Sequence, residues 1–223
     1  MTDAHCHVSG GDESVREFLI GRDFFGLHPW EVRDDSPFPE PWLRGELTAH
    51  PRAGVGEIGL DRLRSREISQ SMRDAFVTQL ELAREFGRPV VLHGAKCWGQ
   101  VVAAIKNSKI QSPLLFHGFS RADGLIADIV ALNGYISVGP AVLNDHAVNY
   151  RELVKKIPAD RLLVETDRDC PAAEFLNSLT GQPLTIGEVM AKTAELRGMT
   201  FAELERLTDA NASRFMARWE VGG

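Results

Sequence analysis

The sequence predicts an α/β fold of the TIM-barrel type, a ring of parallel strands in (β/α)8-like order with helices outside. Two observations lead to this prediction. Short apolar or β-branched runs alternate along the chain with longer stretches of helical period, as in repeated βα units around a parallel sheet. Several of these runs end in a histidine or an acidic residue, and polar groups that close buried strands lie at the C-terminal face of a barrel.

Seven runs are predicted to form strands of this barrel. Each is short and rich in apolar or β-branched residues. The runs are Asp3–Val8, Phe24–His28, Gly54–Ile58, Pro89–His93, Leu114–His117, Tyr135–Val138 and Arg161–Glu165.

Helical patterns occupy the stretches between the later strands. Apolar residues recur at helical spacing over residues 72–86, 101–105 and 125–132, which predicts helices of the outer ring. Thr185 with Glu188, and Thr200 with Glu203, each fit a capping box ahead of a further helix, and Gly198 is expected to end the first of these two. The prolines at 37, 39 and 41 predict a loop after the second strand.

Length and composition favour one globular domain over residues 1–223. The 223 residues fall in the range of single α/β barrels, and the chain is 43% hydrophobic and 25% charged. No run approaches the ~20 apolar residues of a membrane helix, and no basic or apolar leader opens the chain. We therefore expect a cytoplasmic location without a membrane partner. Three cysteines without paired spacing argue against a disulfide framework and a thiolate zinc site.

The candidate metal ligands are histidines and carboxylates at strand ends. In Asp3-Ala4-His5-Cys6-His7 the two histidines alternate, so both point to one face of a strand and can hold one ion. Any single strand-end histidine is more often a hydrogen-bonded structural residue, but five strands that end in a metal-competent group favour joint ligation. The predicted ligands are His5, His7, Glu57, His93, His117 and Asp167.

Two divalent cations fit this set better than one. Six ligands exceed what a single tetrahedral ion accepts, and a carboxylate such as Glu57 can bridge two ions about 3.5 to 4 Å apart. Because it contains no thiolate, the set of six ligands suits Zn²⁺, Mn²⁺ or Mg²⁺, and the ligand types alone do not distinguish these three ions. The formal net charge of -6 means that the surface as a whole does not attract nucleic acid, so any attraction for DNA must be local, and bound cations would supply it.

The order of these motifs resembles the TatD family of metal-dependent hydrolases in the amidohydrolase-like superfamily. The matching stretches span nearly the whole chain and include Gly26-Leu27-His28-Pro29-Trp30, Gly56-Glu57-Ile58-Gly59-Leu60-Asp61 and Glu165-Thr166-Asp167. The resemblance implies the same six ligands, with Glu57 shared by both ions. It also implies hydrolysis of DNA phosphodiester bonds, as 3′ to 5′ exonuclease trimming of single-stranded DNA or 3′ ends.

Catalysis is then expected to use a metal-activated water, which Asp167 orients or deprotonates. His28 resembles a family position near the substrate phosphate, although a structural role at a helix start fits it equally. Arg62, Lys96 and Arg121 follow ligand-bearing strands and are candidates for phosphate contacts, or else solvated loop charges. The predicted catalytic residues are Asp167, Glu57 and His28.

The chain departs from the family pattern in three places. Residues 8–23 are too few for the usual helix, strand and helix, so we expect a barrel that is irregular or seven-stranded there, with residues 14–20 as a short helix or a remnant strand. Gly94-Ala95-Lys96 replaces the usual Ser-Arg after His93, and Arg168-Asp169-Cys170-Pro171 replaces a small residue and proline after Asp167.

These departures keep two other functions open. A hydrolase of a small amide, ester or lactone would use the same two-metal site, and the substrate pocket would decide between them. A narrow apolar pocket favours this alternative, whereas an open groove lined by Arg and Lys favours DNA. The third hypothesis is a catalytically idle partner in a protein complex, which the retention of all six ligands argues against.

Overall fold

The computed structural model describes residues 1–64, 66–120, 122–168 and 183–217. Within these ranges eight strands pair in parallel, so the chain has one strand more than the seven expected. β3 to β8 form one sheet in chain order, and β1 pairs with β2. The strands are β1 Thr2–Cys6, β2 Arg16–Leu19, β3 Phe24–Phe25, β4 Gly54–Asp61, β5 Val90–Ala95, β6 Leu114–Phe116, β7 Gly134–Val138 and β8 Leu162–Val164.

Two contacts join the two sheets into a ring. Ile20, just after β2, forms a parallel bridge with Phe24 of β3. At the other seam the Asp167 amide, beyond β8, donates to the His5 carbonyl of β1 at 3.0 Å. The predicted TIM-barrel-like architecture is therefore present, with irregular seams on both sides of β1 and β2.

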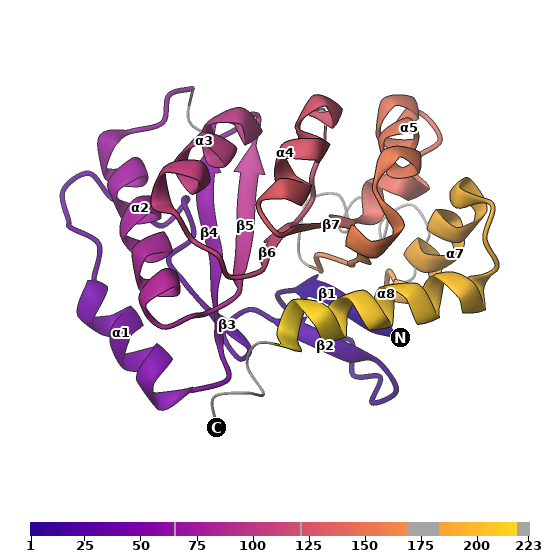
Figure 1. The fold of residues 1–223 in the computed structure, drawn as a ribbon, viewed down its shortest axis with the longest axis horizontal. Coiled ribbons are helices and arrows are strands. Elements are labelled where there is room, and N and C mark those ends of the chain that lie inside the picture. Colours follow the sequence, from indigo (N-terminus) through magenta and orange to yellow (C-terminus); the bar gives the residue numbers. More distant parts are fainter. Residues whose placement is uncertain (65, 121, 169–182, 218–223) are drawn as a thin grey trace.

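The helices lie outside this ring, mostly beside β4 to β8 (Figure 1). Both predicted capping boxes are present, and Gly198 ends α7 with a φ of 63°. Pro41, expected in a loop, is instead the second residue of α1, where its missing N–H leaves no helical bond unmade. The helices are α1 Glu40–Ala49, α2 Gln70–Glu85, α3 Trp98–Ser108, α4 Ile126–Ala131, α5 Val148–Lys156, α7 Ile186–Arg197 and α8 Phe201–Met216.

The two faces of the sheet bury two separate apolar clusters. In β5, Val90 and Leu92 pack with the outer helices, whereas Val91 belongs to a second cluster on the opposite face. That second cluster is closed by Phe215 of α8, whose ring lies 6.1 Å from the rings of Phe18 and Phe24. Because side chains alternate along a strand, the same inner face carries His93 at the end of β5.

The segment between β1 and β3 has no helix among its residues. Residues 7–15 connect β1 to β2, and residues 20–23 connect β2 to β3. Residues 16–19 form a strand because Phe18 turns inward against Phe24 and Phe215, which a single turn of helix would not allow. In Figure 1 the yellow helix α8 runs alongside β1 and β2, and so covers the side that lacks helices of its own.

Candidate metal centre

Glu57 lies at the centre of the predicted ligand set. Its carboxylate is buried, with two histidines facing Oε2 and three facing Oε1, the third of these being His28 at 3.3 Å. Oε2 lies 3.3 Å from His5 Nε2 and 3.2 Å from His7 Nε2. Oε1 lies 2.6 Å from His93 Nδ1 and 2.7 Å from His117 Nε2. The single carboxylate therefore joins a histidine pair from β1 and its following loop to a pair from β5 and the turn after β6.

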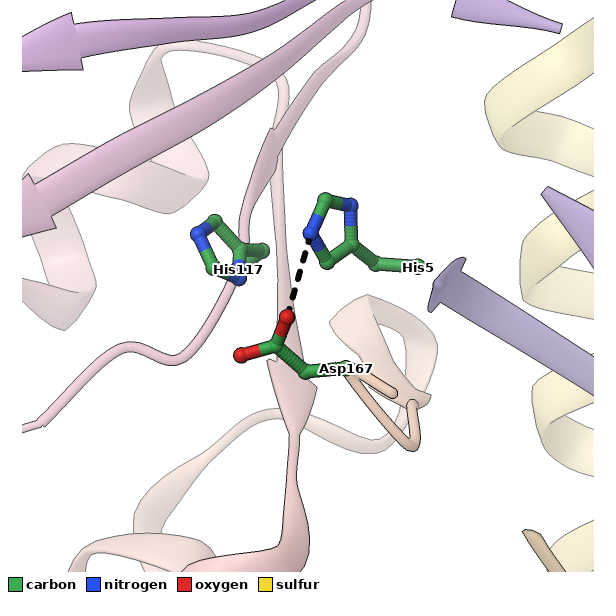
Figure 2. A group of neighbouring side chains, drawn as sticks. All are labelled: His5, His117 and Asp167. Carbon is green, nitrogen blue, oxygen red and sulfur yellow. Dashed lines mark ion pairs between the residues drawn. The ribbon is translucent and has the colours of Figure 1, made fainter. Parts of the chain in front are cut away.

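Asp167 completes the set from the loop after β8. Its Oδ1 lies 3.5 Å from His5 Nε2 and 3.8 Å from His7 Nε2, and Figure 2 shows its carboxylate pointing toward the ring of His5, with His117 beside them. Its φ of 45° is in the left-handed region that non-glycine residues seldom adopt, and such residues cluster at functional sites. Three groups each bring ligand atoms within 4.8 Å of one another: His5, His117 and Asp167; His5, His7 and Glu57; His28, Glu57 and His93.

The glycines of β4 explain how Glu57 reaches this position. The register between β4 and β5 shifts by one residue between Val55 and Ile58, and such a bulge redirects a side chain. Glu57 lies within the bulge. Gly59 then lies so close to β5 that a Cβ atom there would come within 2.0 Å of the His93 carbonyl oxygen, so only glycine fits.

Two further carboxylates orient the histidine ligands. Asp61 Oδ2 lies 2.9 Å from His93 Nε2, which leaves His93 Nδ1 facing Glu57. Glu165 Oε1 lies 3.7 Å from His117 Nδ1 and accepts the Gly118 amide at 2.7 Å. The sequence motifs contained both acids but gave neither a role, because the signal that identifies them is their distance from a histidine ligand.

The pKa directions follow from burial and from this mutual pairing. Burial raises the pKa of Glu57, but the surrounding histidines, above all His117, outweigh it and hold the pKa well below its usual range. Burial lowers the pKa of His117, but Glu57 and Glu165 raise it well above its ordinary value. Burial raises the pKa of Asp167, so this carboxyl takes up a proton more readily than an exposed aspartate.

The site fits a divalent cation on its own geometry. His5 is fully buried, and among the described residues neither of its ring nitrogens has a hydrogen-bond partner. Leaving a buried polar nitrogen unpaired costs about 1–3 kcal/mol, which coordination of a cation would offset. The thiols of Cys6 and Cys97 instead face the carbonyls of Phe18 and Leu60. The facing donors are imidazole nitrogens and carboxylate oxygens, the set that Zn²⁺ and Mn²⁺ accept.

Comparison with known proteins identifies the family. The family model described as TatD-related DNase matches residues 16–217. The chain belongs to the TatD family. It is thereby a metal-dependent hydrolase, as the sequence motifs predicted.

Named relatives and solved structures agree with this assignment. The chain is 29% identical over 204 residues to the uncharacterized metal-dependent hydrolase YabD of Bacillus subtilis. This alignment covers 91% of this chain and 80% of YabD. It is 31% identical over 194 residues to the 3′-5′ ssDNA/RNA exonuclease TatD of Klebsiella pneumoniae, covering 83% and 73%. The crystal structure of the TatD homologue YjjV of Escherichia coli superposes with a TM-score of 0.81 at 26% identity, covering 96% of each chain.

Two cavities flank the metal centre of this TatD-family chain. Both are lined in part by His93, His117 and Asp167, so the two cavities adjoin at these candidate ligands and are together called the cleft. The first, of about 520 Å³, extends towards β2 and β3 and includes Arg64. The second, of about 410 Å³, extends over the loops after β5 and β6 and includes Lys96.

The predicted substrate contacts divide between these cavities and the surface. His28 lines the first cavity, with Nε2 3.3 Å from Glu57 Oε1. Lys96 lines the second. Arg62 is exposed and lines neither of the two, whereas Arg64, which the motifs did not single out, lines the first. Arg121 lies outside the described residues.

Proposed function

We propose that this chain is a two-metal phosphodiesterase that shortens single-stranded DNA from its 3′ end. The observation that carries the proposal is the Glu57 carboxylate, whose Oε2 faces His5 and His7 and whose Oε1 faces His93 and His117, with His28 beside them at 3.3 Å. One ion would be held by His5, His7 and Asp167 together with Glu57. The other would be held by His93 and His117, again with Glu57. A bridging carboxylate of this kind is the hallmark of two-metal hydrolases.

The protein residues then have distinct tasks in the reaction. When bound, the ions would supply Lewis-acid activation of water and neutralise charge on the phosphoryl oxygens. Asp167 accepts the proton of the attacking water, a task that suits a carboxyl whose pKa burial has raised. Asp61 and Glu165 hold His93 and His117 in place. His28, which lies 3.4 Å from His93 and lines the cleft, contacts the substrate phosphate.

The cleft supports a polymeric substrate over a small amide, ester or lactone. Two cavities that share candidate ligands leave room for the substrate on either side of the bond that breaks, and among the described residues each is lined by one Arg or Lys, namely Arg64 or Lys96. These charges lie in an otherwise acidic protein of net charge -6. A relative named as a 3′-5′ ssDNA/RNA exonuclease adds to this support. A cytoplasmic location stays a prediction.

The test is an end-labelled oligonucleotide assay with Mg²⁺, Mn²⁺ or Zn²⁺. We expect a 5′-labelled single strand to give a ladder of shorter products, and a 3′-labelled strand to release a labelled mononucleotide at once. A His5→Ala and His7→Ala double variant serves as the inactive control. Intact oligonucleotide in every metal would overturn the proposal, and turnover of a lactone or amide panel in the same preparation would establish the alternative.

The metal count has its own measurement. Elemental analysis of the purified protein should find two ions per chain. One ion per chain, with full nuclease activity, would refute the shared role of Glu57.

A further inference from the structure

Trp30 is a large aromatic side chain at the mouth of the metal cleft. It is 45% exposed and lines the same cavity as His28, His93 and Asp167. Its indole Nε1 donates a hydrogen bond to Asp61 Oδ2 at 2.7 Å. A half-exposed tryptophan leaves much apolar surface in water, and such surface beside a catalytic centre indicates a binding role.

Arg64 lies against this indole. The centre of its guanidinium is 5.1 Å from the centroid of the Trp30 ring, within the range of a cation–π contact. The backbone amide of Arg64 donates to Asp61 Oδ1 at 2.8 Å. The same carboxylate therefore holds the indole and the backbone of Arg64, and the guanidinium lies over the indole.

Asp61 also fixes this pair relative to the reacting centre. Its Oδ2 contacts both Trp30 Nε1 and Nε2 of the candidate ligand His93. Because one buried carboxylate connects the ring to a metal ligand, the indole keeps a set position beside the bond to be cleaved. Preorganisation of this kind lowers the cost of ordering a substrate group.

We propose that Trp30 and Arg64 form a nucleobase subsite for one of the two nucleotides that flank the scissile phosphate. The inference rests on the proposed nuclease function. It assigns to Trp30 and Arg64 the recognition of a substrate base beside the metal centre. The base stacks on the indole face, and the guanidinium contacts the base or the adjoining phosphate. Stacking does not depend on base identity, which suits an enzyme that removes nucleotides of any sequence.

In the part of the chain that the structure describes, the second cavity has no exposed aromatic ring like that of Trp30. Trp98 lines it but is only 5% exposed, because its ring packs against Phe116 and Phe119. The nucleotide on that side meets Lys96 and Ser120 instead. Recognition of the base is therefore expected for one flanking nucleotide and not for the other.

The test compares oligothymidylates that carry a base-free tetrahydrofuran residue at one or the other flanking position. For the wild type we expect kcat/KM to fall on the order of tenfold at one of the two positions. Trp30→Phe and Trp30→Leu both lose the hydrogen bond to Asp61, but only phenylalanine keeps an aromatic face. Trp30→Phe should keep most of the preference for the base, whereas Trp30→Leu should lose it and show a raised KM on the base-bearing substrate.

Trp42→Ala is the matched control, because Trp42 is 41% exposed on α1 and lines neither cavity. It should keep the wild-type preference. A wild type that cleaves base-bearing and base-free substrates equally well overturns the subsite but leaves the nuclease function standing. An equal loss of rate on both substrates in Trp30→Leu shows a structural role only, and also overturns it. A wild type that shortens no oligonucleotide overturns the nuclease function, and the subsite with it.

Discussion

The two sides of the barrel supply the metal centre by different means. On the side of β4 to β8, helices follow the strands and pack over the outer face of the sheet (Figure 1). On the side of β1 to β3, short connectors without a helix join the strands. Yet His5, His7 and His28 come from this second side and reach the same carboxylate as His93 and His117.

Long-range polar contacts replace the missing helices. Arg168, after β8, donates to Glu17 Oε1 at 2.7 Å and to the Val8 carbonyl at 3.1 Å. Asp3 accepts the Thr166 hydroxyl at 2.6 Å. The positions of the candidate ligands therefore depend on the strands and on the polar contacts between their ends, whereas the outer helices mainly cover the core.

The largest effect is expected where both sides meet, at Glu57. Glu57→Gln keeps the side-chain volume but removes the charge that both histidine pairs face, and Asp167→Asn removes the proton acceptor. Each should lower kcat at least about 10³-fold with little change in circular dichroism. Steady-state kinetics at saturating metal would measure the loss of kcat, and wild-type turnover in either variant would contradict the assigned roles.

The next largest effect is expected from Phe215, which closes the inner cluster on the side without helices. Phe215→Ala should lower the free energy of unfolding by about 3–5 kcal/mol, because it leaves a cavity beside Phe18 and Phe24. Leu80→Ala in α2 is the counterpart on the helix-covered side, with an expected cost of about 2–5 kcal/mol. Urea unfolding measures both. A cost below about 1 kcal/mol for Phe215→Ala would mean that α8 does not hold the inner cluster together.

Metal removal should distinguish the two histidine pairs. Saturating metal should raise the free energy of unfolding by about 2.7 kcal/mol for each bound ion at a hundredfold excess over Kd, and chelation should remove this gain. We expect each double variant, His5→Ala with His7→Ala or His93→Ala with His117→Ala, to keep part of the response. Complete loss in both, measured by thermal melting, would indicate one site instead of two.

The same stabilisation should grow with pH. Although burial lowers the pKa of His117, Glu57 and Glu165 raise it above the unfolded value, so without metal its protonated form stabilises the fold at low pH. That contribution is lost as the pH rises through the raised pKa, whereas metal binding needs the neutral imidazole. The metal-induced shift in Tm should therefore be larger at about pH 8 than at about pH 6. An equal shift at both would show that no ligand loses a proton on binding.

The smallest effect is expected at Arg168. Arg168→Met should lower the free energy of unfolding by about 2 kcal/mol, because it removes a charged donor from the nearly buried Glu17. Arg44→Met is the control on the covered side, where an exposed pair with Glu85 is worth under about 1 kcal/mol. Chemical denaturation would measure the free energy of unfolding of both variants. An equal loss in the two would show that Arg168 contributes no more to the β1 to β3 side than an exposed ion pair does.

Local patterns predicted most of the elements but not the irregular side. The caps of α7 and α8 and the apolar stripe of α2 depend on neighbouring residues, so the sequence shows them directly. β2 is different, because four residues become a strand only through Phe215, almost 200 positions away. The sequence alone therefore does not distinguish a short helix from a strand over residues 14–20.

The six candidate ligands could be chosen from sequence because each lies in or directly after a recognisable strand run, and the structure brings them together, although Glu57 lies in the middle of β4 and not at its end. Their binding of metal stays a prediction. The surrounding groups could not be chosen. Arg64 enters the cleft in place of Arg62 because the amides of Leu63 and Arg64 fold back onto Asp61. Trp30 bonds to the same acid from 31 positions upstream. Neither contact leaves a local signature.

The position of Phe215 has a consequence for biosynthesis. The inner core receives Ala4 from β1 and Phe215 from α8, more than 200 positions apart along the chain. Contacts this distant in sequence slow folding, because a long loop must close before they form. The inner face of the nascent chain thus stays without Phe215 until α8 has been synthesised, and a ribosome that stalls before α8 releases a polypeptide prone to aggregation.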